Sequence, residues 1–93
     1  IIMHGAIVNA GSRIGKNSII NSNTLIEHDT TIGDHCHIST NTVINGEVEI
    51  GDNSFIGSNT VLKQQISIGS NCVIDAGMYM KKNIKDGSLI KNE

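Results

Sequence analysis

The chain has 93 residues, carries a formal net charge of −2, and contains no Pro, no Trp, one Phe and one Tyr. A chain of this length forms at most one small domain, and its charge gives no electrostatic reason to bind nucleic acid or an anionic membrane. No apolar run approaches the roughly 20 residues that a membrane-spanning helix needs. The abundant Ile, Thr, Asn and Gly residues favour strands and tight corners.

An aliphatic residue or Met occupies every sixth position of the chain. This first column runs without a break through Ile2, Val8, Ile14, Ile20, Ile26, Ile32, Ile38, Ile44, Ile50, Ile56, Leu62, Ile68, Ile74 and Met80. A second column of uncharged, mostly small residues lies four positions after each member: Ala6, Ser12, Ser18, Thr24, Thr30, Cys36, Thr42, Val48, Ser54, Thr60, Ile66, Cys72, Met78 and Ile84. A helical period of 3.6 cannot produce this spacing.

Gly, Asn and Asp are frequent between the two columns, as in Ile14-Gly15 and Ile32-Gly33. Gly and Asn tolerate the backbone angles of tight corners. Six residues therefore form one short strand and one corner, and three such units close a coil of eighteen residues. The repeat predicts an all-β, single-stranded parallel β-helix of about five coils, in which residues eighteen apart are stacked neighbours.

Two cysteines, Cys36 and Cys72, belong to the second column and lie two coils apart. Two coils correspond to about 9–10 Å, whereas a disulfide needs Cα atoms within about 7 Å. We expect two free thiols that fill the core. Free thiols are typical of a reducing compartment, so a cytoplasmic location is expected.

Four histidines interrupt the pattern of small polar residues: His4, His28, His35 and His37. On the coil map His28 stacks between Ala10 and Gly46, whose small size leaves room for a ligand. Asp29 can orient the imidazole and raise its basicity. His28 could then act as the general base in acyl transfer from a thioester, with the Gly46 N–H as the oxyanion donor. A solvated surface histidine beside a surface aspartate explains these residues equally well.

The stretch from Asn21 to Asp29, which reads NSNTLIEHD, is followed by the segments Ile32-Gly33-Asp34, His37-Ile38-Ser39, Asn45-Gly46-Glu47-Val48 and Ile50-Gly51-Asp52. Together they resemble the sugar O-acyltransferases of the sialic acid O-acetyltransferase (NeuD) family. The bacterial UDP-4-amino-sugar (bacillosamine pathway) and GDP-perosamine N-acetyltransferases share the pattern. The resemblance covers essentially the whole chain and implies left-handed winding, an exception to the right-handed rule for parallel crossovers.

The resemblance also implies an acetyl-CoA-dependent acetyltransferase that acts on an amine or hydroxyl of a nucleotide-activated or sialic-type sugar. Relatives of this kind are homotrimers with clefts between subunits. His28 matches their general base, and Asp29 matches the acidic residue that increases its basicity. Gly46 matches a glycine beside the acetyl carbonyl.

The remaining matched positions concern the two ligands. His37 matches a histidine that contacts acetyl-CoA, in the same chain or the adjacent one, and Asn21 matches an asparagine near the acceptor. Backbone at the positions of Ser58 and Ala76 carries the pantetheine arm. The coil map agrees, because these two residues are eighteen apart and form a track parallel to the axis.

Two departures separate the chain from these relatives. Nothing in it resembles their N-terminal βαβ-type domain, which binds the nucleotide of the sugar. It also stops at Gly87–Glu93 instead of a Gly-Asn-Pro-Ala-Lys-like segment. We expect residues 1–93 to be the β-helix acyltransferase domain of a longer protein, with part of the acceptor and CoA sites elsewhere.

Two other functions compete with acyl transfer. The γ-class carbonic anhydrases bind zinc on this fold through three histidines, two of them five residues apart. Here His35 and His37 follow His28 by seven and nine residues, and Cys36 points inward, so no metal is expected. The prism could instead be a trimerisation module without catalysis, with His4 and His35 at its surface or interface.

Overall fold

The computed structural model describes residues 1–93 and contains fourteen strands of two residues each. Their bounds are β1 (Ile7–Val8), β2 (Arg13–Ile14), β3 (Ile19–Ile20), β4 (Leu25–Ile26), β5 (Thr31–Ile32), β6 (His37–Ile38), β7 (Val43–Ile44), β8 (Glu49–Ile50), β9 (Phe55–Ile56), β10 (Val61–Leu62), β11 (Ser67–Ile68), β12 (Val73–Ile74), β13 (Tyr79–Met80) and β14 (Leu89–Ile90). No helix long and apolar enough to cross a membrane is present.

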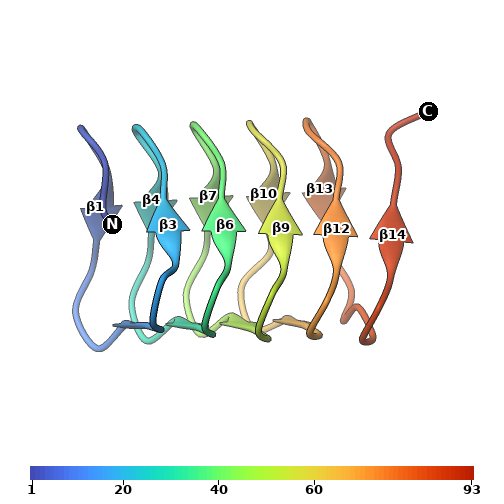
Figure 1. The fold of residues 1–93 in the computed structure, drawn as a ribbon, viewed down its shortest axis with the longest axis horizontal. Coiled ribbons are helices and arrows are strands. Elements are labelled where there is room, and N and C mark those ends of the chain that lie inside the picture. Colours follow the sequence, from blue (N-terminus) through green and yellow to red (C-terminus); the bar gives the residue numbers. More distant parts are fainter.

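The strands form three parallel sheets along the sides of a prism with extents of 30 × 23 × 20 Å (Figure 1). The first sheet has the order β1-β4-β7-β10-β13, the second β2-β5-β8-β11, and the third β3-β6-β9-β12-β14. Paired residues are eighteen apart, as in Ile26 opposite Ile44. The predicted all-β parallel β-helix of about five coils is confirmed. We call the turn from the first to the second sheet the first corner, from the second to the third sheet the second corner, and from the third to the first sheet the third corner.

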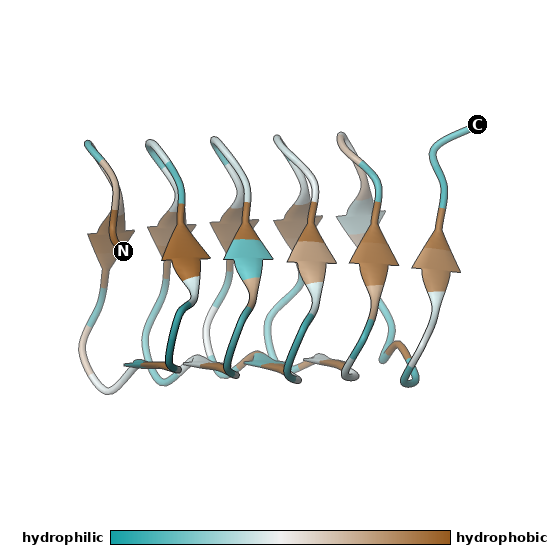
Figure 2. Ribbon diagram, viewed as in Figure 1, coloured by the Kyte–Doolittle hydropathy of each residue, from teal (hydrophilic) through white to brown (hydrophobic).

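The second residue of each strand points into the prism and forms the core. From Ile20 to Ile74 every member of the first column is at most 2% exposed. Figure 2 shows the resulting pattern of apolar strands and more polar corners, with β6 partly polar. Cys36 and Cys72 join this core as free thiols, as the coil spacing predicted.

Buried hydroxyls of the second column hold successive coils together. Ser18 Oγ donates to Gly33 O at 2.7 Å, and Thr24 Oγ1 donates to Ser39 O at 2.8 Å. The same contact, to a carbonyl fifteen residues later, is made by Thr30, Thr42, Ser54 and Thr60. No buried side-chain nitrogen or oxygen lacks a partner. A small hydroxyl is therefore favoured in this column because it satisfies a corner carbonyl that water cannot reach.

The corners correct one detail of the sequence interpretation. At thirteen successive corners, from Gly5 to Gly77, one residue has φ between 56° and 78°. Ten of these residues are Gly, Asn or Asp, which tolerate the left-handed region. The glycines that follow inward isoleucines, such as Gly15 and Gly33, have no such φ. They are required because a Cβ there would collide with the next coil, at Gly33 with Asp52 Oδ1.

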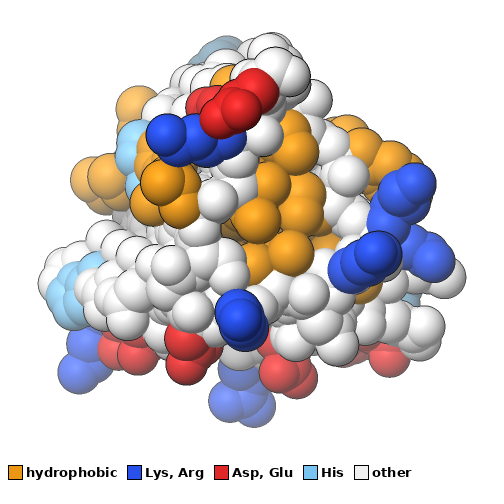
Figure 3. All heavy atoms as spheres, turned by 90° about the vertical axis from the view of Figure 1, so that its right-hand side faces the viewer, with side chains coloured by type: hydrophobic (Ala, Val, Ile, Leu, Met, Phe, Trp, Pro, Cys, Tyr) orange, Lys and Arg blue, Asp and Glu red, His pale blue; other side chains and the backbone are white.

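The last coil is two residues shorter than the others. Ile84 bridges to Ile68, and Ile90 pairs with Ile74, so the spacing falls from eighteen to sixteen. The assignment of Ile84 to the second column was wrong, because the shortened corner moves it into the first. A shallow hollow lined by Ser67, Asn83 and Asp86, among others, lies where the corner is shortened. Figure 3 looks onto this end and shows apolar side chains in its centre with lysines around them.

Candidate active site

His28 and Asp29 lie in the first corner, immediately after β4. The His28 side chain is 60% exposed, and its Nδ1 is 3.1 Å from Asp29 Oδ2. Asp29 has φ of 56°, so it occupies the left-handed position of the corner. That conformation alone favours Asp, Asn or Gly. The carboxylate also contacts the imidazole, and a hydrogen bond from Nδ1–H leaves Nε2 as the acceptor.

Gly46 lies one coil further along the same corner, directly against the His28 ring. Glu47 N donates to His28 O at 2.9 Å and ties the two coils together. A Cβ on Gly46 would be 2.6 Å from His28 Nε2, so only glycine lets the ring lie there. Gly46 is buried, yet its N–H donates no hydrogen bond within the chain. In the neutral ring the acceptor Nε2 and the free N–H of Gly46 therefore belong to residues in direct contact, which suits a base and an oxyanion donor.

His37 and Asn21 lie elsewhere on the prism. His37 begins β6 and points outward from the third sheet, where its ring contacts Phe55 edge-to-face at 5.4 Å and 87°. Asn21 follows β3, and its Nδ2 is 3.1 Å from His37 Nε2. The eighteen-residue rule places Phe55 over His37, but sequence reasoning overlooked this pair. The Asn21 contact spans sixteen residues and depends on the direction of both side chains, so no stacking rule predicts it.

Ser58 and Ala76 stack in the third corner, as their spacing predicted. Gly77 N donates to Ser58 O at 2.9 Å, and the backbone of Ala76 packs closely on Gly57. Ser58 Oγ also pairs with Ser39 Oγ at 2.7 Å. The two residues thus form a continuous track parallel to the prism axis, with small side chains that leave the backbone approachable.

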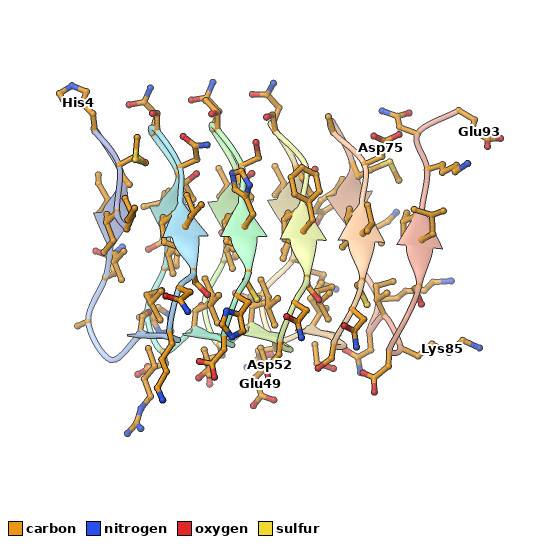
Figure 4. All side chains as sticks on the ribbon, viewed as in Figure 1. His4, Glu49, Asp52, Asp75, Lys85 and Glu93 are labelled. Carbon is orange, nitrogen blue, oxygen red and sulfur yellow. The ribbon has the colours of Figure 1, made fainter.

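The predicted site residues divide into two groups on different edges of one chain. His28, Asp29 and Gly46 are in the first corner, whereas the other four are on the third sheet and in the third corner. Figure 4 shows this separation: Asp75, beside Ala76, lies on the opposite side of the prism from Glu49 of the second sheet. A single chain does not unite the catalytic group with the group expected to hold the ligands.

Two residues near His28 were missed. Glu47 and Gln65 hold the left-handed position at φ of 61° and 64°, and Gln65 Nε2 donates to Glu47 Oε1 at 3.2 Å. Side chains other than Gly, Asn or Asp are costly there, and strained backbone gathers at functional sites. The sequence signal that could have identified them is the absence of Gly, Asn and Asp at the same corner position in two successive coils. The only other such corner is at His35.

The histidine-rich segment shows no grouping suited to a metal. No cluster of three or more His, Cys, Asp or Glu side chains is positioned to hold an ion. Cys36 Sγ points into the core, 3.1 Å from Gly51 O, while His35 is exposed. The inward direction predicted for Cys36 is confirmed, and the neighbouring histidines cannot share a site with it.

Comparisons with known proteins agree with the hexapeptide-repeat fold. The family described as bacterial transferase hexapeptide (six repeats) matches residues 11–46 and 29–64, and the hexapeptide repeat of succinyl-transferase matches residues 47–82. No curated protein sequence matches.

Solved structures of bacterial enzymes have the same fold. A variant of perosamine N-acetyltransferase from Caulobacter crescentus, in complex with CoA and GDP-perosamine, is 27% identical with a TM-score of 0.91. The acetyltransferase domain of PglB from Neisseria gonorrhoeae, in complex with acetyl coenzyme A, is 27% identical with a TM-score of 0.72. Each match covers 96% of this chain and 46% of the other, so the chain spans about half the length of these structures. LpxA from Acinetobacter baumannii is 32% identical over 76% of this chain and 28% of its own, with a TM-score of 0.74.

Proposed function

Because the chain belongs to the bacterial hexapeptide transferase family, we propose that it is an acetyl-CoA-dependent acetyltransferase. The acceptor is an amine or hydroxyl of a nucleotide-activated or sialic-type sugar. The proposal rests on the first corner, where the His28–Asp29 pair lies directly against Gly46 and its free N–H. The ligands bound in the perosamine and PglB enzyme structures, GDP-perosamine and acetyl coenzyme A, support the two ligand classes.

The chemistry follows from these three residues. Acetyl-CoA supplies an activated thioester. His28 Nε2 accepts the proton of the attacking amine or hydroxyl, and Asp29 holds Nδ1–H so that Nε2 stays free for this task. Gly46 N–H stabilises the negative charge that develops on the carbonyl oxygen. The imidazolium then returns the proton to the departing thiolate. The base contributes about 10²–10⁴ in rate, and one oxyanion donor about 10²–10³.

A trimer would unite the two groups of residues. The outward side chains of the first and third sheets are mainly apolar, including Ile7, Phe55, Val73, Tyr79 and Leu89, all more than a third exposed. The second sheet instead presents Arg13, Thr31, Glu49 and Ser67. Apolar patches of this kind mark interfaces. Packing the first sheet of one subunit on the third sheet of the next is a head-to-tail contact that closes into a ring.

Heights along the prism support this arrangement. A threefold axis parallel to the prism keeps each residue at its own height in every subunit. His28 and His37 are nine residues apart, half a coil, so their heights differ by about 2.4 Å. Ser58 lies about 3 Å and Ala76 about 8 Å above Gly46 on the same scale. The proposed cleft thus has the base at one level and a track for the pantetheine arm rising from it.

A pair of histidine variants tests the proposal. His28→Ala should lower acetyl transfer by about 10² or more, because the base is lost. His35→Ala is the matched control, since His35 is also exposed in a corner of the same coil. Thiol release from acetyl-CoA would be followed with a panel of amino and hydroxy nucleotide sugars, and oligomeric state by sedimentation. Turnover retained in His28→Ala would remove His28 from the mechanism, and a wild-type protein without an acetyl-CoA-dependent thermal shift would be a scaffold.

A further inference from the structure

The side-chain amide of Asn21 has a single permitted orientation. Its Oδ1 accepts hydrogen bonds from Ser22 N at 2.7 Å and from Ser22 Oγ at 3.4 Å. The backbone N–H of Ser22 can only donate, so the amide oxygen must face Ser22. The Nδ2 group, which can only donate, then faces His37 Nε2 at 3.1 Å.

This orientation decides where the His37 ring carries its proton. A donor directed at Nε2 requires that nitrogen to be an acceptor, so a neutral ring has its proton on Nδ1. The neutral histidine side chain in water carries its proton mainly on Nε2, so the protein must select the Nδ1–H form. Phe55, edge-to-face at 87°, keeps the ring from rotating away from Asn21. His37 therefore presents Nδ1–H as its one free polar group.

We propose that Asn21 is a positioning residue that holds His37 as the neutral Nδ1–H tautomer, so that His37 donates to a carbonyl oxygen of the acyl donor. This assigns Asn21 a role through His37 and not through the acceptor sugar. The identity of the ligand rests on the proposed function, whereas the tautomer does not. A neutral N–H donor suits a thioester or amide carbonyl, whereas a phosphate would favour a cationic partner.

The chain contains a matched pair that lacks these restraints. Asn17 Nδ2 lies 3.4 Å from His35 Nδ1, both residues are exposed, and the Asn17 amide makes no other hydrogen bond. His35 has no aromatic neighbour that limits its ring. Of these two histidines, only His37 should therefore be held in one tautomer, and His35 should behave like histidine in water.

Two-bond ¹H–¹⁵N spectra of the ¹⁵N-histidine-labelled protein report each tautomer directly, without any substrate. In the wild type, above the pH at which histidine is protonated, His37 should show a protonated Nδ1 and His35 mainly a protonated Nε2. Asn21→Asp keeps the oxygen that accepts from Ser22 but replaces the NH₂ group facing His37 with a second carboxylate oxygen. Because that oxygen can only accept, the proton of the His37 ring should move to Nε2. Asn17→Asp should leave His37 unchanged. A protonated Nε2 on His37 in the wild type would overturn the proposal.

Acetyl-CoA affinity tests the consequence. Asn21→Asp should weaken binding about tenfold, the value of one hydrogen bond to the ligand, while the pH profile of turnover set by His28 stays in place. In His37→Asn the amide NH₂ takes the place of Nδ1–H, so acetyl-CoA affinity should be kept. In His37→Gln the NH₂ takes the place of Nε2, so acetyl-CoA affinity should fall. In the His37→Asn background Asn21→Asp should have little effect. Unchanged affinity in Asn21→Asp with a shifted tautomer would refute the ligand contact, whereas a wild type that binds no acetyl-CoA would refute the proposed function instead.

Discussion

The two buried glycines of the chain, Gly46 and Gly57, allow activity and stability to be separated. Neither has a positive φ, so alanine fits the backbone at both positions. At Gly46 the new Cβ would meet three atoms of the His28 ring, at 2.6, 2.9 and 3.0 Å. At Gly57 it would meet the backbone of Asp75 and Ala76 in the next coil. An exposed ring can swing into solvent, but a hydrogen-bonded coil cannot.

Gly46→Ala should therefore lower turnover but not stability, whereas Gly57→Ala should lower stability. In Gly46→Ala the loss of contacts with the displaced ring is offset by the entropy that alanine removes from the unfolded chain, about 0.4–1 kcal/mol. The free energy of unfolding should change by less than about 1 kcal/mol, while turnover falls about 10²-fold or more because the base has moved. Gly57→Ala should lose about 1–3 kcal/mol through overpacking, or about 4–8 °C in Tm for each kcal/mol.

Thermal unfolding by circular dichroism and thiol release from acetyl-CoA measure the two quantities on the same preparations. The nuclear Overhauser contact between the His28 ring and the Gly46 α-protons should disappear in Gly46→Ala. Wild-type turnover in that variant would show that the position of the His28 ring against Gly46 is not needed. A fall in Tm as large as that of Gly57→Ala would show that the ring cannot move away, and the reasoning would fail.

Three further predictions concern the fold. Gln65→Asn should raise the free energy of unfolding by about 1 kcal/mol, because Asn accepts the left-handed corner at lower cost, and a lower Tm would contradict this. Ser54→Ala should cost about 1–3 kcal/mol in denaturant unfolding, since the Ser54 hydroxyl donates to Gly69 O and accepts from Cys72 N; no loss would mean that these groups find other partners. Burial raises the pKa of the Cys36 thiol. As the pH rises, the thiol therefore loses its proton in the unfolded chain before it does so in the folded protein. The free energy of unfolding should keep its full value below about pH 8.5 and decline as the pH rises above it. The decline should be less steep in Cys36→Ala.

The fold could be read from the sequence because a coil contacts only the coils beside it. The first column identified the inward residue of every strand from Val8 to Met80, and the spacing of eighteen placed His28 next to Gly46 and Ser58 next to Ala76 in adjacent coils. These neighbours follow from counting, since stacked backbones keep the register through their hydrogen bonds. The same rule placed the two cysteines too far apart to bond. It failed at Ile84, where the chain omits two residues and the count no longer applies.

The eighteen-residue stacking of His28 on Gly46 was thus determined by the sequence alone, as were the strands and the free thiols. Only the tertiary structure revealed that a side chain at Gly33 would collide with the next coil. It alone showed that the Asp29 carboxylate contacts the His28 ring, and that the Asn21 amide contacts His37 sixteen residues away. It also showed that His28 and His37 lie on different edges of the chain. The physical reason is that backbone pairing repeats with the period of the coil. Side-chain direction, corner conformation and the approach of neighbouring coils depend on the individual residues that meet in space.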